Sequence, residues 1–251
     1  MDGGHRDRWS AVASEWAELW GGVAEPVWRV LVEVSEVGPG SRVLDVGCGN
    51  GDLLAHLGAL GVLSAGLDPA PGMVALARSR VPASDVRLGS ADHLPWPDGT
   101  FDLATSVNAL QFADDTLDAL AEMARVAKRG GLVAVSNWAE AERNDLSTIE
   151  DAVARAVGTV SLPDGDLRSA GGLEQLFADG GLKVVAAGLV DVPWRAADDD
   201  ALVRGVLLGE DQTVLANGAS TVIAAARRFR TPAGDYHLAN AFRYAIARTS
   251  R

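Results

Sequence analysis

Two hydrophobic periods alternate along the middle of the chain. Short apolar runs rich in branched residues are typical of strands that are buried on both faces. Such runs occupy residues 42–46, 63–67, 85–88, 101–107 and 132–137. Segments with apolar positions three and four apart predict helices between them, at 52–60, 72–80 and 116–127. This alternation predicts a parallel sheet with helices on both faces.

The two flanks of the chain are mostly helical in pattern. Residues 9–37 predict two helices, separated near Gly21 and Gly22. After residue 138 the pattern predicts helices at 143–157, 173–178, 198–208 and 212–229, and strands at 182–192 and 238–248. The expected fold class is α/β, Rossmann-like and doubly wound, with a mostly parallel seven-stranded sheet.

Composition shows no linker, so we expect a single domain over 1–251. Within it the pattern separates a helical segment at 1–37 from the alternating core at 38–139. Residues 140–251 would supply helices inserted near the C-terminus and the last two strands.

Charge and cysteine content narrow the classes of partner. The 22 Lys and Arg residues against 34 Asp and Glu residues leave a net charge of −12, which disfavours nucleic acid and anionic membranes as partners. The single cysteine excludes an intrachain disulfide and fits a reducing compartment. The N-terminus lacks the apolar run of a signal peptide, and no run of about 18 apolar residues could span a bilayer. We therefore expect a soluble, cytoplasmic protein.

A glycine loop joins the strand at 42–46 to the next helix. Gly47, Gly49 and Gly51 let the backbone turn and approach a ligand closely, at the place where open α/β sheets bind ligands. Dinucleotide-binding loops have the spacing G-x-G-x-x-G, which would place a glycine at position 52. Asp52 stands there instead and would repel a pyrophosphate, so a dinucleotide is disfavoured. A turn that binds no ligand is the other alternative.

Four segments in order resemble the motifs of class I S-adenosylmethionine-dependent methyltransferases, especially those that act on small molecules. They are the Asp-x-Gly-x-Gly-x-Gly loop at 45–51 and the segments 66–73, 89–102 and 125–132. Together they cover about residues 40–138. The resemblance implies S-adenosylmethionine as the cofactor and a small molecule as the methyl acceptor. It also implies that 1–37 is a helical lid, that 38–139 is the cofactor-binding core, and that 140–251 supplies the substrate-side helices. The chain departs from the family in having Lys-Arg-Gly-Gly at 128–131, and Gln111 where many relatives carry histidine.

The resemblance also implies roles for individual residues. Asp68 would accept the ribose hydroxyls, or else only cap the following helix. Asp92 would accept the adenine amino group, with a plain turn residue as the alternative, and the backbone N–H of His93 would meet a ring nitrogen. Asp45 would organise the loop, and the carbonyls of Gly47 and Asn108 would contact the amino group of the methionine. The implied cofactor-binding set is Asp45, Gly47, Cys48, Gly49, Asp68, Pro69, Met73, Ala91, Asp92, His93 and Asn108.

The acceptor side is less defined by motifs. Direct methyl transfer requires alignment and exclusion of water, and a base only for an acceptor proton of high pKa. Gln111 is the candidate for orienting an acceptor, and His237 or His5 for a base. No cluster with metal-ligand spacing is present, so we expect no metal.

Tryptophans are concentrated in the N-terminal helices. Those at Trp9, Trp16, Trp20 and Trp28 predict either an aromatic wall over the ligand or ordinary packing, and Trp138, Trp194 and Phe229 are further candidates for an acceptor pocket. We expect a neutral or hydrophobic acceptor with an O, N or C nucleophile. The main alternative is a protein that binds S-adenosylmethionine without methyl transfer, as a cyclase or binding module. The sequence predicts neither the identity of the acceptor nor the oligomeric state.

Overall fold

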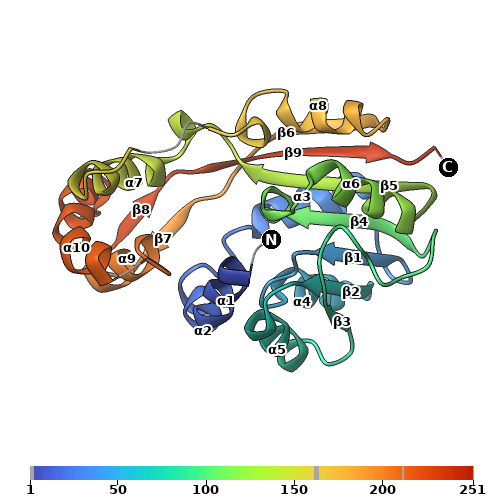
Figure 1. Ribbon diagram of the computed structural model, residues 1–251, viewed down its shortest axis with the longest axis horizontal. Helices are drawn as coiled ribbons and strands as arrows, with labels where there is room; N and C mark the ends of the chain where they lie inside the picture. The colour runs from blue at the N-terminus through green and yellow to red at the C-terminus, as the bar shows by residue number, and fades with distance from the viewer. Residues whose placement is uncertain (1–2, 161–163, 211, 251) are drawn as a thin grey trace.

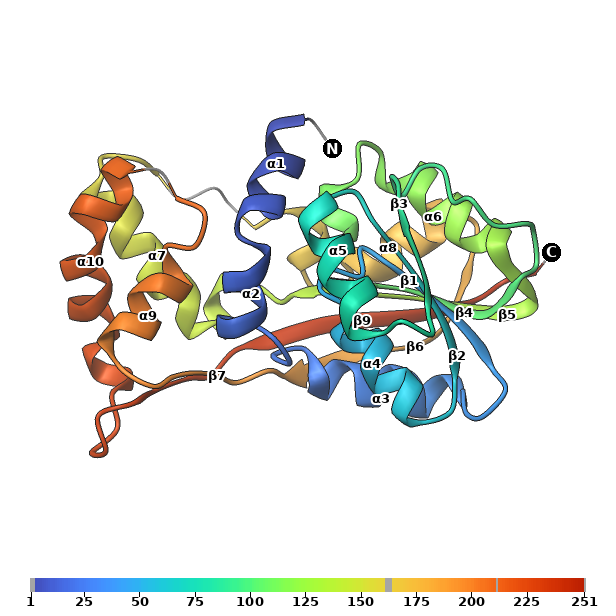
Figure 2. The same ribbon diagram turned by 90° about the horizontal axis from the view of Figure 1, so that it is seen from below.

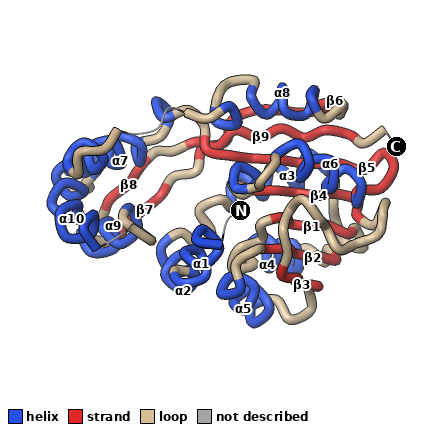
Figure 3. The backbone as a smooth tube through the Cα atoms, in the orientation of Figure 1, coloured by secondary structure: helices blue, strands red, loops and turns tan. Residues whose placement is uncertain are grey.

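The molecule is built on one large sheet. This computed structural model describes residues 3–160, 164–210 and 212–250. Seven strands lie in the order β3-β2-β1-β4-β5-β9-β6 (Figure 3). They are β1 (Arg42–Val46), β2 (Leu63–Asp68), β3 (Asp85–Leu88), β4 (Phe101–Val107), β5 (Ala127–Trp138), β6 (Lys183–Asp191) and β9 (Ala241–Arg248). The first five are parallel, and β9 is antiparallel to β5 and β6. The predicted fold class is confirmed.

Helices cover both faces of this sheet (Figure 1). They are α3 (Glu25–Ser35), α4 (Asp52–Ala59), α5 (Pro71–Arg80), α6 (Thr116–Val126) and α8 (Gly172–Asp179). Leu31 and Leu57 of α3 and α4 belong to one apolar core, and Met123 and Phe177 of α6 and α8 belong to the core on the opposite face. With both faces covered, the inner strands are apolar along most of their length, as the sequence pattern predicts.

Local chemistry determines where these helices start. Asp115 caps α6, because its carboxylate accepts hydrogen bonds from the backbone N–H groups of Leu117 (2.8 Å) and Asp118 (3.1 Å). Pro71 opens α5, where its missing N–H costs nothing. The segment between β2 and α5 is therefore a short turn that ends the strand at Asp68.

Two lid helices, α1 (Gly3–Ala11) and α2 (Ala13–Leu19), precede α3. The sequence predicts two helices over 9–37, whereas the structure has three, with breaks at Val12 and at residues 20–24. The hydroxyl of Ser10 accepts a hydrogen bond from the Gly72 backbone N–H (2.7 Å), which fastens α1 to the start of α5. In Figure 2 the lid helices stand between the sheet and a second group of helices.

That second group is the C-terminal insert, residues 192–240, together with α7 (Asp145–Ala156). The insert contains α9 (Asp199–Val206), α10 (Gln212–Ala226) and an antiparallel pair, β7 (Trp194–Ala196) and β8 (Tyr236–Leu238). The β7–β8 pair is not among the predicted elements, because three-residue strands carry no readable period. Four 3-10 turns complete the described elements: η1 (Leu110–Phe112), η2 (Ala141–Arg143), η3 (Asp166–Arg168) and η4 (Arg227–Phe229).

Candidate functional site

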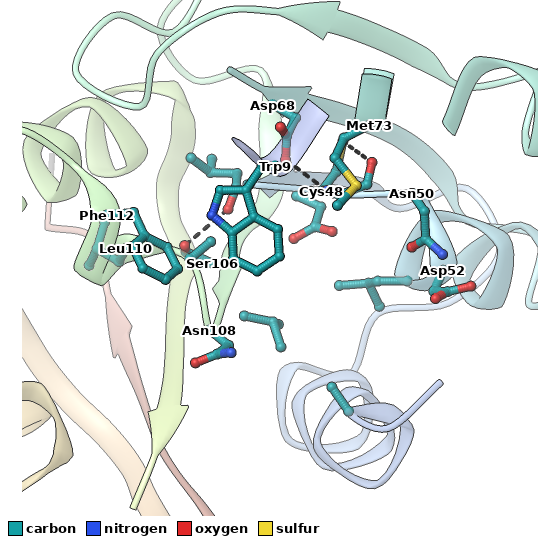
Figure 4. Close-up of a pocket in the computed structure, with 18 of the residues that line it drawn as sticks. Trp9, Cys48, Asn50, Asp52, Asp68, Met73, Ser106, Asn108, Leu110 and Phe112 are labelled. Atoms are coloured by element: carbon teal, nitrogen blue, oxygen red, sulfur yellow. Dashed lines mark hydrogen bonds between the residues drawn. The ribbon is translucent and has the colours of Figure 1, made fainter. Parts of the chain in front are cut away.

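A pocket lies where the loops after β1, β2 and β4 meet the lid helices. It has a volume of about 1240 Å³, part of it open to solvent. In Figure 4 the side chains of Trp9, Cys48, Asp68 and Met73 gather around the same space. This is the edge of an α/β sheet at which ligands usually bind.

The pocket brings together most of the residues predicted for cofactor binding. Those in its lining are Asp45, Gly47, Cys48, Gly49, Asp68, Pro69, Met73, Ala91 and Asn108. Asp92 and His93 are exposed and lie outside the lining, directly after Ala91. The His93 N–H, predicted to meet an adenine nitrogen, donates to the Ser90 carbonyl (3.2 Å). Their roles in binding adenine stay predictions.

The glycine loop is fixed by backbone hydrogen bonds to the neighbouring strand. The N–H groups of Gly47 and Cys48 both donate to the carbonyl of Leu67, at 2.7 and 3.0 Å. Gly47 has a φ of +80°, and a Cβ there would lie 2.2 Å from the Cβ of Ala109. A Cβ at Gly49 would meet no atom within 4 Å, so this part of the loop faces open space. The loop therefore needs glycine at 47 for packing and leaves the backbone at 49 accessible.

Asp68 ends β2 and faces the loop. It is only 7% exposed, and its two carboxylate oxygens accept hydrogen bonds from the backbone N–H groups of Gly49 and Ala70, both at 2.9 Å. Burial raises the pKa of Asp68, and these two bonds oppose the shift. A carboxylate has about four acceptor positions, so two remain for a ligand.

Asp45 lies beneath the loop, where it is 3% exposed. Burial raises its pKa from an ordinary value of 3.8 to about 7; the Thr105 hydroxyl, which donates at 3.1 Å, opposes the rise, and the charge of Asp68 adds to it. Between pH 3.8 and 7 the folded protein thus holds this proton more tightly than the unfolded chain does. Stability then falls as the pH rises through that window and is level above it.

Replacing Asp45 by asparagine should remove this loss. Because Asp45→Asn does not ionise, its free energy of unfolding relative to the wild type should increase by about 2–4 kcal/mol between about pH 4 and pH 8. Urea unfolding across this range measures the change. Thr105→Val should extend the loss in the otherwise wild-type protein to higher pH. If the difference in free energy of unfolding between Asp45→Asn and the wild type is the same at about pH 4 and pH 8, Asp45 is not the source of the loss of stability.

Cys48 is buried within the glycine loop. Burial raises the pKa of its thiol, so the sulfur stays protonated and is a poor nucleophile. This agrees with a packing role for a small side chain. Figure 4 shows it beside Met73.

Asn108 and Gln111 form a unit after β4. Asn108 has a φ of +54°, a conformation that asparagine tolerates better than most residues. The Gln111 side-chain amide donates to the Asn108 side-chain oxygen (3.1 Å) and to its backbone carbonyl (3.4 Å). Gln111 is not part of the described lining, so here it supports Asn108 instead of reaching into the pocket. A role for Gln111 in orienting an acceptor stays a prediction.

Aromatic side chains form the wall opposite the loop. The tryptophans in the lining are Trp9, Trp16, Trp20, Trp28 and Trp138, with Phe112 and Phe242 beside them. The predicted candidates Trp194 and Phe229 are outside the lining; Trp194 stacks behind Trp20, with the ring centroids 4.3 Å apart. Ring contacts join Trp9, Trp16, Trp20 and Trp138 in a continuous series, whereas the ring of Trp28 lies against His56.

The histidines proposed as bases are not brought into the described lining. His237 is on β8 in the C-terminal insert, where its Nε2 lies 2.8 Å from a carboxylate oxygen of Asp235. The side chain of His5 falls outside the described part of the structure. Among residues 3–160, 164–210 and 212–250 no group of three or more His, Cys, Asp and Glu residues could hold a metal ion.

Sequence reasoning missed several lining residues. Asp52, considered only as a helix start, accepts a hydrogen bond from the Gly22 N–H (3.3 Å) and forms an ion pair with Arg80 (2.6 Å). It therefore joins the end of the lid to α4. Asn50 and Ser106 also line the pocket. Asn50 lies in the glycine loop and Ser106 near the end of β4, so these positions could have identified both residues from the sequence.

Residues 44–135 match the family model described as a methyltransferase domain. This segment is a class I methyltransferase domain. Over 116 residues the chain is 38% identical to malonyl-(acyl-carrier protein) O-methyltransferase of Yersinia pestis, a match that covers 46% of this chain and 43% of that protein. The match thus spans less than half the length of this relative. The family resemblance read from the sequence is confirmed.

Two solved structures show how widely this fold is used. A putative methyltransferase of Bacillus halodurans superimposes with a TM-score of 0.61 at 15% identity, covering 89% of this chain and 99% of that one. The (4+2)-cyclase SpnF superimposes with a TM-score of 0.56 at 19% identity, covering 86% and 79%. Methyltransferases and a cyclase share the fold, so the fold alone does not identify the reaction. No helix in the described ranges is both long and apolar enough to cross a bilayer.

Proposed function

We propose that this protein transfers the methyl group of S-adenosylmethionine to a small, neutral or hydrophobic organic acceptor. The observation that carries the proposal is the pairing of a glycine loop with Asp68 on one side of a pocket and a tryptophan wall on the other. The first side is suited to a nucleoside with a polar tail. The second is suited to an apolar molecule.

The residues present fit this cofactor. The free space at Gly49 accepts close approach of a ligand to the backbone, and the two remaining acceptor positions of Asp68 match a pair of ribose hydroxyls. The buried carboxyl of Asp45 and the carbonyl of Asn108 add acceptors for an ammonium group. When bound, S-adenosylmethionine supplies an electrophilic methyl group on a positively charged sulfur.

The acceptor side works by alignment and by excluding water. Trp16, Trp20 and Trp138 line this side of the pocket with apolar rings, which favour a hydrophobic acceptor and keep solvent from it. The described lining contains three aspartates and no lysine, arginine or histidine, so its charge disfavours an anionic acceptor. These features support a neutral acceptor over a carboxylic acid.

Transfer of a labelled methyl group tests this proposal. The purified protein is incubated with S-adenosylmethionine labelled at the methyl carbon and with two panels. One contains neutral aromatic alcohols and amines. The other contains a malonyl thioester, the acceptor class in the name of the Yersinia pestis relative. We expect label in a neutral product, with an equal amount of S-adenosylhomocysteine. Label found only in a malonyl ester would overturn the proposed acceptor class.

The second candidate function is binding of S-adenosylmethionine without methyl transfer. The structural likeness to the cyclase SpnF favours this candidate, because that protein has the same fold and is a cyclase. It predicts cofactor binding with no label in any product, and conversion of a polyunsaturated substrate whose mass does not change.

A further inference from the structure

The C-terminal insert does not reach the pocket. No described residue between 139 and 241 belongs to the lining, although the sequence predicts a substrate side over 140–251. From the described part of 140–251, the lining includes Phe242, which is on β9. In Figures 1 and 2 the insert instead lies on the outer side of the lid helices, which separate it from the glycine loop.

Arg204 of α9 holds α2 by charge. Its Nε lies 2.7 Å from a carboxylate oxygen of Glu15, and its two terminal nitrogens lie 3.0 and 3.2 Å from the two oxygens of Glu18. The two parallel bonds to the Glu18 carboxylate also fix the relative orientation of the two side chains, which an ordinary surface ion pair does not. The three side chains are between 36% and 61% exposed, so salt should weaken the contact.

Trp194 of β7 holds the C-terminal end of α2 by ring stacking. Its ring is stacked on Trp20 with 6° between the planes, and Trp20 is stacked in turn on Trp16. Each of the first two indoles also bonds across the contact: Trp194 Nε1 donates to the Leu19 carbonyl (2.8 Å) and Trp20 Nε1 to the Gly205 carbonyl (3.2 Å). Trp194 and Trp20 are both buried. Trp20 and Trp16 belong to the pocket lining, and Trp194 does not.

The opposite end of the lid is fastened to the core. Ser10 bonds to Gly72 at the start of α5, and Ala13 packs with Ala70 and Met73. The lid helices thus connect two bodies, and the tryptophan wall depends on both attachments.

We propose that Arg204 and Trp194 are positioning residues through which the C-terminal insert holds Trp16 and Trp20 against the pocket and controls how fast a bound cofactor leaves. The inference rests on the proposed function, because the cofactor named there is the ligand. Opening of the lid requires the Arg204 contact to break. Release of the cofactor is therefore slowed by residues that do not touch it.

Stopped-flow tryptophan fluorescence tests this coupling with S-adenosylhomocysteine as the probe. Arg204→Met should raise the dissociation rate constant about fivefold at low salt, because the ion pairs with Glu15 and Glu18 are lost. Dissociation from the wild type should become faster with added salt, and dissociation from Arg204→Met should not. Arg29→Met removes an ion pair with Glu25 on α3 that does not touch the insert, and it should leave the rate unchanged.

A double-mutant cycle separates positioning from general loosening. Glu18→Gln and Arg204→Met should each speed dissociation, and the double variant should be no faster than Arg204→Met alone. Gly205→Ala tests the shape contact, because a Cβ there would lie 2.4 Å from the Trp194 ring; it should speed dissociation and keep the salt dependence. Additive effects in the cycle, or rates equal to the wild type, would overturn the inference.

Failure of the proposed function would look different. If the wild type does not bind S-adenosylhomocysteine, the cofactor assignment is wrong, and hydrogen exchange of the ligand-free protein still tests the contact. Arg204→Met should then speed exchange at the amides of α2 and its C-terminal end, such as Trp16 and Trp20, with α4 unchanged. Equal exchange in α2 would contradict the role of Arg204 as well.

Discussion

Replacing Asp68 by alanine should lower the affinity for S-adenosylhomocysteine by a factor of about ten or more. Hydrogen bonds to a charged group contribute about 1.5–3 kcal/mol each, and about 1.4 kcal/mol already corresponds to tenfold. The variant also leaves the N–H groups of Gly49 and Ala70 without their acceptor, so the loop itself loses support. Isothermal titration calorimetry measures the affinity directly.

Two further variants make this result interpretable. Asp68→Asn keeps one acceptor oxygen and should fall between the wild type and Asp68→Ala. Asp118→Ala removes an exposed carboxylate from α6, outside the pocket, and should bind as the wild type does. An Asp68→Ala protein that is folded and binds within about twofold of the wild type would exclude Asp68 from the ribose site.

Replacing Gly47 by alanine should destabilise the fold and abolish binding together. A left-handed φ costs an alanine about 1–2 kcal/mol, and the overlap with Ala109 should add about 1–3 kcal/mol. Relief of that overlap requires the loop to shift relative to Ala109, which disturbs its hydrogen bonds to Leu67 and the surface that a ligand would contact. Thermal unfolding and calorimetry should therefore both change.

The overlap with Ala109 can be tested separately from the backbone cost. Gly40 has a φ of +87°, and a Cβ there would meet no atom within 4 Å, so Gly40→Ala should show the backbone cost alone and bind normally. The double variant Gly47→Ala with Ala109→Gly removes the overlapping methyl group and should recover part of the stability. Equal stability of Gly47→Ala and Gly40→Ala would show that the contact with Ala109 is unimportant.

The central sheet was predictable because its strands are buried on both faces. Continuous apolar runs such as the one at 132–135 are typical of such strands, and the spacing of Gly47, Gly49 and Gly51 locates the loop between strand and helix. A last strand at 238–248 was also predictable, but the structure begins it at Ala241, and its antiparallel orientation was not predicted. Motifs that are local in sequence thus carried both the fold and most of the pocket.

The attachments of the lid were not predictable in the same way. Trp194 and Trp20 are far apart in the sequence, and nothing in either local pattern indicates that their rings stack. His237 was a candidate base because it lies in a flanking segment that could fold over the pocket, but pairing of β8 with β7 sets it in the insert. Such features depend on long-range packing, which periodicity does not report.

A crystal structure with S-adenosylhomocysteine would show directly whether this pocket holds the cofactor. We expect the ribose hydroxyls within hydrogen-bond distance of Asp68, the amino-acid tail along the backbone of Gly47 and Gly49, and the sulfur facing Trp16 and Trp20. Density for the ligand at any other place on the protein, or none after soaking at saturating concentration, would contradict this expectation.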